Sequence, residues 1–572
     1  MTGNDLALLA RSAVHLQPAQ VAHRARLRAQ RTALRRWPRA GRRLLSGPDP
    51  AGATGWPAAF VPIDARASLG WPGIAALAAG RIELLGMARE IGDPPDWRQA
   101  GAPRLWRFHL HYWDWAWGLA ADPDRRAARA MFARLWRSWQ AAAELGSGDA
   151  WLPYPAALRA WSWCGLHADL VAGGELEPAF ARELAVHAGF LRRHLESDVG
   201  GNHLVKDLKA LAGLAVFFAD SQLLRRVLRR LVRQLAIQVL PDGGHYELAP
   251  AYHCQVLADL IDVADLVAAT GREPTPEIDL AIKRMRRWLG RALSPDGQVP
   301  LLNDGYPVPR ALVAALRPGP GADQPLLALG GSGLVLAAAG GWHLLADVGA
   351  PCPDELPAHA HADTLGCIVH VDGTPLLIDT GTSTYAAGPA RDYERSTAAH
   401  NTVGVDGADS TEVWGAFRAA RRARVRGFAA CSGAAGVSIE AWHDGFRRLA
   451  GRPRHRRRWF LTAAGLRVDD LVSGQGRHQV VIYWHLAAGS TVLLEERAAV
   501  ISTPAGSFRA HVAASDPATL AVGSRPVAVG FERRTDALLL TCGIDAELPV
   551  RVSTAWCRAS RNGAAGHLGG LA

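Results

Sequence analysis

LGCIVHVDGTPLLIDTG, residues 365–381, is the stretch that decides the fold. Two short apolar runs flank Asp372-Gly373, and an Asp-Gly pair in that setting is a strong signal for a tight β-hairpin. Because no helical pattern separates this hairpin from the similar runs around it, we expect an antiparallel β-sandwich over residues 326–572. The similar runs are at 332–340, 342–349, 400–407, 436–445, 456–474, 479–486 and 537–544.

Upstream of this region the pattern becomes helical. Apolar residues recur there at three- and four-residue spacings, in segments separated by short breaks that contain glycine or proline. Such breaks predict antiparallel helix pairs, which are compatible with a toroid but do not identify one. We therefore expect an α+β multidomain protein with a helical domain at 51–325. The six helical segments are 125–145, 155–171, 203–220, 221–240, 252–270 and 277–293.

The first 50 residues form a basic extension. The run RARLRAQRTALRRWPRAGRR at 24–43 predicts a helix that docks on the chain with a solvated basic face, and membrane-surface or polymer binding is the alternative. The first 20 residues lack the pattern of a secretory signal, and no run of about 18 apolar residues predicts a transmembrane helix. We expect a cytoplasmic protein, with the periplasm or cell envelope as the alternative.

Charge and cysteine content restrict the function classes. A net charge of +11 suits a polyanionic partner: an acidic polysaccharide, a nucleic acid or an anionic lipid. No recognised nucleic-acid motif accompanies the arginine runs at 447–448 and 452–458, so we do not expect a nucleic-acid partner. The seven cysteines are scattered, which predicts reduced packing residues and no disulfide framework.

A His-x-His motif lies in the β region. His359 and His361 precede Asp379 and His400, and histidines two residues apart on an extended chain point to opposite faces. We expect one histidine to face a cleft while the other packs with Asp379 and His400 as a two-His, one-carboxylate metal site. A hydrogen-bonded structural cluster is the alternative. The ligand types suit zinc without proving it.

Two helix starts carry further polar residues. Asn202 and His203 follow Gly200-Gly201, and Tyr252 and His253 follow the run PDGGHYELAPA at 241–251. Single polar residues at helix starts are commonly caps, and Tyr252 and His253 have ordinary packing as their alternative. Together, however, an amide, imidazoles and a phenol at helix entrances predict a cleft.

Aromatic residues at 106–117 and 151–161 form a third group. Large aromatic side chains often fill cores, but some could stack on sugar faces while Arg159 meets a carboxylate in a bidentate pair. Tyr385 and Arg395 could line the cleft, with loop packing as the alternative, and Asn303-Asp304-Gly305 looks like a junction turn of low functional weight. The substrate-binding candidates are Trp106, His111, Tyr112, Trp113, Arg159, His253, Tyr385 and Arg395.

Four motifs together resemble the heparinase II/III family and its alginate- and oligoalginate-lyase relatives. They are GGNHLVKD at 200–207, PDGGHYELAPAYH at 241–253, HAHADTLGCIVHVDGTPLLIDTGTSTY at 359–385 and RDYERSTAAHNTVGVDG at 391–407. The resemblance spans roughly residues 95–480. It implies an incomplete (α/α) toroid followed by an antiparallel β-sandwich, with the active site between them.

The resemblance also implies roles for the polar residues. Asn202 and His203 would neutralise the uronate carboxylate, Tyr252 would act as general base or acid, and His359 would be its acid/base partner. Elimination needs such donors, because removing the proton next to the carboxylate builds negative charge on it, and an acid must protonate the leaving O4. A structural zinc site would carry over to His361, Asp379 and His400.

We therefore expect a polysaccharide lyase that cleaves a uronate-containing acidic polysaccharide by β-elimination. Processing of a bacterial exopolysaccharide fits the resemblance as well as scavenging does. The alternatives are a non-catalytic acidic-polysaccharide-binding protein on the same scaffold and a metal-dependent hydrolase, which would release saturated products.

Overall fold

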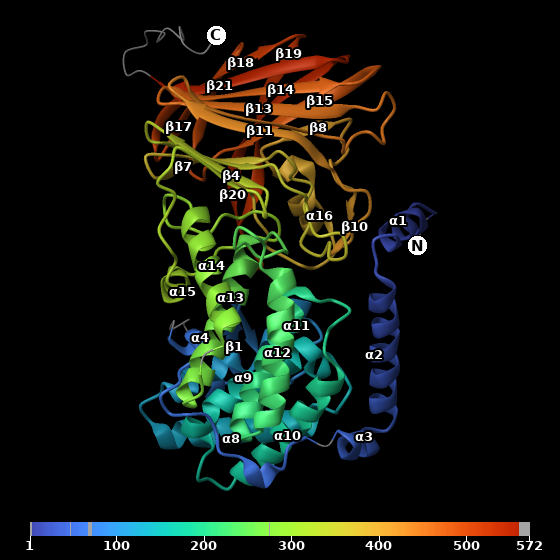
Figure 1. Cartoon of the computed structure of the whole chain (residues 1–572), viewed down its shortest axis with the longest axis vertical. Helices are drawn as coiled ribbons and strands as arrows, with labels where there is room; N and C mark the ends of the chain where they lie inside the picture. Colours follow the sequence, from blue (N-terminus) through green and yellow to red (C-terminus); the bar gives the residue numbers. More distant parts are fainter. Residues whose placement is uncertain (1–2, 46, 67–70, 274, 560–572) are drawn as a thin grey trace.

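The structure is a computed structural model that describes residues 3–45, 47–66, 71–273 and 275–559. Figure 1 shows helices at one end of the molecule, β-strands at the other and the N-terminal helices along one side. Helix α15 (Arg310–Leu316) ends the helical half, and strand β3 (Leu326–Leu329) begins the β half. The predicted order of a helical toroid followed by a β-sandwich is confirmed.

The toroid has inner and outer helices. Helices α9 (Pro153–Leu170), α11 (Gly201–Phe217) and α13 (Pro250–Ala269) are buried on nearly all sides, which places them inside. Helix α12 (Ser221–Gln238) buries leucines and a valine on one face and exposes arginines on the other, as an outer helix does. The other helices of this half are α4 (Ile63–Arg66), α5 (Ile74–Ala78), α6 (Arg104–Tyr112), α7 (Trp117–Ala120), α8 (Arg125–Ala142), α10 (Glu177–Arg193) and α14 (Pro276–Ala292).

Some elements of the helical half were not predicted. Strands β1 (Arg81–Leu84) and β2 (Met87–Glu90) pair as a hairpin, and Ile82 and Leu84 on β1 are buried in the toroid core. The sequence analysis found neither this hairpin nor helix α10. Four-residue strands are too short for their alternation to stand out from the surrounding helical pattern.

Among the described residues, the β half contains three large antiparallel sheets and a short two-stranded one formed by β9 (Val413–Trp414) and β10 (Arg418–Ala419). The first consists of consecutive strands that end in the hairpin between β6 (Cys367–Val371) and β7 (Thr374–Leu377). Asp372 and Gly373 have φ values of 48° and 80°, and the predicted hairpin turn is therefore confirmed. The earlier strands of this sheet are β3, β4 (Leu334–Ala339) and β5 (Trp342–Asp347).

The other two sheets complete the sandwich. Buried tryptophans, among them Trp342, Trp459, Trp484 and Trp556, fill the space between the layers. The eight-stranded sheet has the order β11 (Val425–Gly433), β12 (Gly436–His443), β13 (Arg454–Thr462), β14 (Gly465–Ser473), β21 (Val550–Arg558), β18 (Gly506–Ala514), β17 (Ala498–Thr503) and β16 (Thr491–Glu495). The four-stranded sheet has the order β19 (Ala518–Gly530), β20 (Arg533–Glu547), β15 (Arg477–His485) and β8 (Val403–Val405).

The N-terminal segment docks on both halves. Helix α1 (Gly3–Ala13) reaches the β half, where Arg11 pairs with Glu412 at 3.1 Å. Helix α2 (Pro18–Arg36) lies on the toroid, where Arg24 pairs with Asp198 at 3.2 Å, and helix α3 (Pro38–Leu44) follows. Most arginines of α2 are exposed, which is the docked arrangement with a solvated basic face that the sequence predicted.

Two further observations concern the helices and the cysteines. Within the described residues, we find no helix whose length and hydropathy would let it span a bilayer. All seven cysteines are free thiols, and most of them are buried packing residues.

Candidate active site

Segments from both halves meet at the junction between toroid and sandwich. Helix α11 contributes Asn202 from its first turn, helix α13 contributes Tyr252, and the loop 303–305 follows the toroid helices. The loop between β5 and β6 carries His359, and the segment after β7 carries Tyr385.

Glu247 is fixed against the start of helix α11. The backbone N–H of Asn202 donates to its Oε1 at 2.9 Å, and Asn202 Nδ2 donates to its Oε2 at 2.8 Å. This approach requires glycine at 201, because a Cβ there would lie 1.7 Å from Oε1. Burial raises the pKa of Glu247, but His359, His245 and Asn202 outweigh burial and lower it to about 2. Glu247 is therefore a carboxylate, as a helix N-terminus favours.

His359 lies between two carboxylates. Its Nδ1 is 2.9 Å from Asp304 Oδ2, and its Nε2 is 3.4 Å from Glu247 Oε2. Because an acceptor faces each ring nitrogen, both nitrogens carry a hydrogen. Burial lowers the pKa of His359, but the bonds to Asp304 and Glu247 outweigh it and raise the pKa to about 9. The side chain is an imidazolium at neutral pH and can donate a proton.

Tyr252 packs directly on this imidazolium. The two ring centroids are 3.9 Å apart, and the Tyr252 hydroxyl lies 2.7 Å from the hydroxyl of Tyr385. Burial raises the pKa of Tyr252 well above its ordinary value, with further contributions from Tyr385, Tyr306 and Asp304. The site thus joins a phenol of the toroid to a phenol and an imidazolium of the β half.

Asp304 is a functional residue that the sequence analysis undervalued. It is fully buried, and its carboxylate accepts hydrogen bonds from His359, His361, Thr382 and Arg391. The Arg391 guanidinium also lies 5.1 Å from the Tyr385 ring. Residues 303–304 form the bend at the junction that the sequence predicted, but the contacts of Asp304 give it a larger part in the candidate site than the low weight expected. Asn-Asp-Gly chemistry indicated only a turn, and nothing in the local pattern indicated burial.

The two histidines do not alternate as on an extended strand, but they divide as predicted: His359 packs on Tyr252, and the ring of His361 lies 5.3 Å from that of His400. His359 and His361 both bond the Asp304 carboxylate, at 2.9 Å each. Their segment is a loop of turns and bends rather than an extended strand, so side chains two residues apart need not alternate. Arg395 helps to hold this loop. Its Nε donates at 3.0 Å to the carbonyl of Ala360, the residue between the two histidines.

Arg395 therefore positions the loop instead of binding substrate as predicted. Its side chain is buried, and its other nitrogens donate to the carbonyls of Gly415 and Arg418 at 2.8 and 3.0 Å. His253 is likewise buried, with Nε2 bonded to the carbonyl of Met285 at 3.1 Å. For both residues the packing alternative holds, and the substrate-binding prediction is wrong.

Most of the predicted aromatic binding group lies in the toroid core. Trp106 donates to the carbonyl of Met87 at 3.0 Å, and Trp113 is fully buried against Trp115. Tyr112 is also buried, with its ring 6.0 Å from that of Tyr154. Because these rings face inward from helix α6 and the turn after it, the prediction that they stack on sugar is wrong for this structure.

Arg159 is enclosed in the same core. Its Nη1 donates to the carbonyl of His111 at 3.1 Å, its Nε lies 3.1 Å from His187 Nε2, and its guanidinium stacks 4.3 Å from the Trp139 ring. Arg159 is 0% exposed and His111 5%. These core contacts occupy both side chains, so the packing alternative holds for Arg159 and His111 in this structure.

His203 has a different setting from Asn202. Its side chain is 35% exposed, its Nδ1 lies 3.1 Å from Glu196 Oε2, and its ring is 4.3 Å from that of Tyr154. Asn202 is buried, and its Oδ1 has no hydrogen-bond partner among the described residues. The pair therefore offers one buried amide and one solvent-accessible imidazole.

The predicted metal ligands do not form a three-ligand site. Asp379 is bonded to His400, with Oδ2 2.7 Å from Nδ1, and His361 is bonded to Asp304. Among the described residues, no three His, Cys, Asp or Glu side chains are grouped as a metal site. His361 Nδ1 and His400 Nε2 are buried without a hydrogen-bond partner in that part of the chain, and the two ring centroids are 5.3 Å apart. These nitrogens suit zinc, but a third ligand is not in place, and no chemical step is derived through a metal.

A buried ion pair in the eight-stranded sheet holds the loops that carry the site histidines. Arg457 on β13 pairs with Asp470 on β14, with Nε–Oδ1 and Nη2–Oδ2 distances of 2.7 and 3.0 Å. The same guanidinium donates through Nη1 to the carbonyls of Leu365 and Asn401, at 2.9 and 2.6 Å. The sheet thereby fixes the ends of the segments that carry the histidines.

Comparisons with solved structures agree with this architecture. A crystal structure of heparinase III has a TM-score of 0.74 at 14% identity, over 89% of this chain and 87% of that one. The heparan sulfate lyase HepC from Pedobacter heparinus has a TM-score of 0.57 at 16% identity, over 94% of this chain and 89% of that one. At these identities the likeness shows the fold.

Sequence comparisons place the chain in a family. FtsZ-localized protein C of Caulobacter vibrioides (strain NA1000 / CB15N) is 28% identical in an alignment of 417 residues that covers 69% of this chain and 70% of that protein. Residues 124–317 match the family described as heparinase II/III N-terminus, and residues 322–541 match heparinase II/III-like, C-terminal. Because these two matches together span most of the chain, the protein belongs to the heparinase II/III family of polysaccharide lyases.

Proposed function

We propose that this protein cleaves a uronate-containing acidic polysaccharide by β-elimination at the junction between toroid and sandwich. The observation that carries the proposal is the contact of Tyr252 with both His359 and Tyr385, at 3.9 Å between ring centroids and 2.7 Å between hydroxyls. It joins the proton-transfer groups of the two halves at one point. Family membership supports the reaction class, and an acidic bacterial exopolysaccharide is the substrate we propose.

In the proposed step, Tyr252 first releases its own phenolic proton to solvent and then, as a phenolate, removes the C5 proton of the uronate. The C5–H electrons form the C4=C5 double bond, the C4–O4 bond breaks, and an acid delivers a proton to the departing O4. His359 suits the role of this acid, because carboxylates bond both of its nitrogens and leave it no free lone pair for a base. The hydroxyl of Tyr385 can stabilise the phenolate of Tyr252.

The substrate carboxylate needs donors as negative charge builds on it. Asn202 and His203 at the start of helix α11 are the proposed donors, and the helix N-terminus adds a favourable dipole. Because Asn202 Nδ2 is bonded to Glu247 in the structure, a bound carboxylate must share or replace that acceptor.

The test is absorbance of the unsaturated uronate during incubation with a panel of polymers. The panel contains heparan sulfate, heparin, hyaluronan, chondroitin, alginate and acidic bacterial exopolysaccharides. We expect one polymer to give absorbing product, and Tyr252→Phe and His359→Ala to reduce the rate about a hundredfold or more. Cleavage without absorbing product would indicate hydrolysis, and binding without cleavage would indicate a non-catalytic binder; either result overturns the proposal.

We also propose that His361 and His400 take part in a zinc site, as the family resemblance implies. Their buried, unpartnered nitrogens support it, although a third ligand would have to move into place. We expect elemental analysis of protein purified without chelator to find stoichiometric zinc and His400→Ala to lose it. A metal-free wild-type protein whose thermal midpoint is unchanged by added zinc contradicts this proposal.

A further inference from the structure

We propose that an arginine-lined cavity beside the candidate active site is a second binding site for acidic oligosaccharide. The cavity has a volume of about 1190 Å³, and seven arginines and two aspartates are among its lining residues. Asn202, Tyr252 and His359 do not line it, but Leu248, the neighbour of Glu247, does. Its use by a glycan goes beyond the elimination step, and the choice of a glycan rests on the proposed function.

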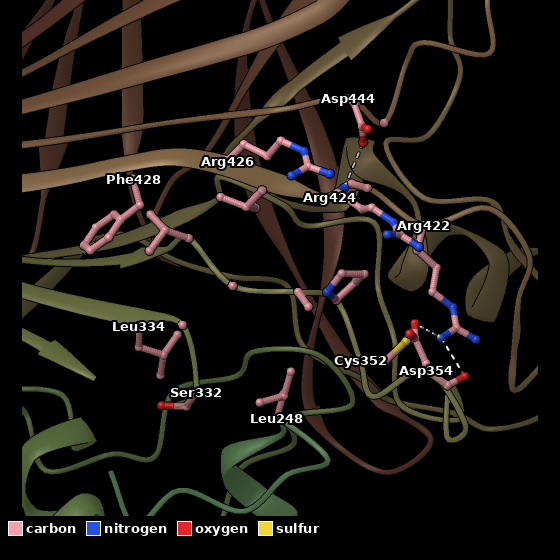
Figure 2. Close-up of a pocket in the computed structure, with 18 of the residues that line it drawn as sticks. Leu248, Ser332, Leu334, Cys352, Asp354, Arg422, Arg424, Arg426, Phe428 and Asp444 are labelled. Carbon is pink, nitrogen blue, oxygen red and sulfur yellow. Dashed lines mark hydrogen bonds and ion pairs between the residues drawn. The ribbon is translucent and has the colours of Figure 1, made fainter. Parts of the chain in front are cut away.

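The walls of the cavity come from distant parts of the chain. Figure 2 shows Arg422, Arg424 and Arg426 along one wall, with Leu248 and Ser332 across from them. The first wall leads into strand β11, the edge strand of the eight-stranded sheet. The second wall combines a toroid loop with the turn between β3 and β4. A concave, arginine-lined surface suits an oligosaccharide chain better than a flat lipid surface.

Most of the arginine charge is uncommitted. Among the described residues, no hydrogen bond or ion pair engages the side chains of Arg424, Arg426, Arg447 or Arg452, and all four are exposed. The two lining aspartates do not neutralise them, because Asp444 accepts from the backbone N–H of Arg424 and Asp354 pairs with Arg422. Four arginines whose side chains have no partner among the described residues therefore line one cavity.

Arg422 gives a second, independent sign of a missing ligand. Its side chain is only 6% exposed, and its Nη1 donates to the carbonyl of Asp354 at 2.7 Å. Its Nε and Nη2 are buried and lack a partner among the described residues. Leaving charged donors buried and unpaired is costly, and a carboxylate or sulfate accepts two parallel bonds from a guanidinium edge.

The backbone of β11 is shaped for this arrangement. A register shift against β12 lies between Arg426 and Ala429, and Gly427 has a φ of +60°. A Cβ at 427 would lie 2.7 Å from the Trp442 indole nitrogen, so the bulge requires glycine. Such bulges re-aim neighbouring side chains, here Arg426 toward the cavity.

The lining favours a glycan over a nucleic acid. Single-stranded nucleic acids are held by aromatic rings on which successive bases stack. Phe428 and His15 are the aromatic residues of this lining, which otherwise consists mainly of arginine, glycine and apolar side chains, with two aspartates and Ser332. Guanidinium groups without a stacking platform suit the carboxylates and sulfates of an acidic oligosaccharide.

The test measures binding of a fluorescently labelled heparin hexasaccharide to the full chain by anisotropy, in a Tyr252→Phe background that prevents turnover. The cavity variant carries Arg424→Gln and Arg426→Gln. The matched control carries Arg182→Gln and Arg192→Gln, two exposed arginines of helix α10 at the far end of the toroid. Both variants remove the same charge from the protein.

We expect the cavity variant to bind about tenfold or more weakly and the control to stay within about twofold of its parent. An unlabelled galacturonate hexamer should compete if carboxylates suffice and fail if sulfates are needed; both outcomes support the site. Three results would overturn the second site. They are an equal loss of hexasaccharide affinity in the two variants, an unchanged affinity in the cavity variant, and stronger competition by a short oligothymidylate than by either glycan.

The result of the hexasaccharide-binding test can be distinguished from the result of the elimination test. If no polymer is cleaved but the hexasaccharide depends on Arg424 and Arg426, the second site stands without the proposed reaction. If Tyr252→Phe abolishes elimination while the cavity variant binds normally, the reaction stands and the second site fails.

Discussion

At the residue scale, the hydroxyl of Tyr385 has a role that can be separated from folding. It lies 2.7 Å from the Tyr252 hydroxyl, so Tyr385→Phe removes the partner that stabilises a phenolate there. We expect elimination to slow about tenfold, with an unfolding free energy changed by about 1 kcal/mol or less. Tyr393→Phe is the control, because the Tyr393 hydroxyl is buried without a partner among the described residues. Equal rates for the two variants would contradict the role.

The same scale shows what the sequence could and could not predict. Asn202, Tyr252 and His359 were found because helix starts and a rare His-x-His motif mark them, and the structure brings them to one junction. Asp304 was missed, because its importance comes from contacts with residues 55 to 87 positions away. Arg159 was misplaced for the converse reason, since a charged residue in a core depends on partners that no local pattern reveals.

At the element scale, the pair of strands β13 and β14 supports the site through Arg457 and Asp470. Burial raises the pKa of Asp470, but Arg457 and His455 outweigh it and lower the pKa to about 2. Its contribution to stability is therefore present above the unfolded pKa near 4 and is lost as pH falls toward 2. We expect Asp470→Asn to lower the unfolding free energy at neutral pH by about 3 kcal/mol, measured by urea denaturation. The difference from wild type should shrink from pH 4 downward.

The control on the same strand is Asp469→Asn. Asp469 is 35% exposed and pairs with Arg467 at 3.2 Å. We therefore expect Asp469→Asn to lower the unfolding free energy by less than about 1 kcal/mol, with little dependence on pH. A loss in Asp469→Asn as large as in Asp470→Asn would show that general surface charge, and not the buried pair, sets the stability. The run at 456–474 predicted β-structure here, but neither its division into two strands nor the buried arginine that links them to the loops.

At the scale of the whole molecule, the N-terminal helices tie the two halves together. Arg11 on α1 pairs with Glu412, and Ser12 accepts a hydrogen bond from Trp414 at 3.0 Å. On α2, Gln20 donates to the carbonyl of Asp198 at 3.1 Å. The contacts of Arg11 and Ser12 hold the β half, and the contact of Gln20 holds the toroid. His15, between these two helices, lines the arginine cavity.

Deleting residues 1–16 should therefore loosen one half selectively. Because α1 is lost while α2 remains, we expect hydrogen exchange to rise about tenfold or more in residues 409–424 and to stay unchanged in 195–199. The second segment is an internal control, since its α2 contacts are outside the deletion. Faster exchange in both segments would mean that the deletion unfolds the docking helix altogether. Unchanged exchange at 409–424 would show that α1 does not hold the β half, and the link between the halves along this side would then rest on α2, where Gln20 also donates to the carbonyl of Glu355 at 3.3 Å.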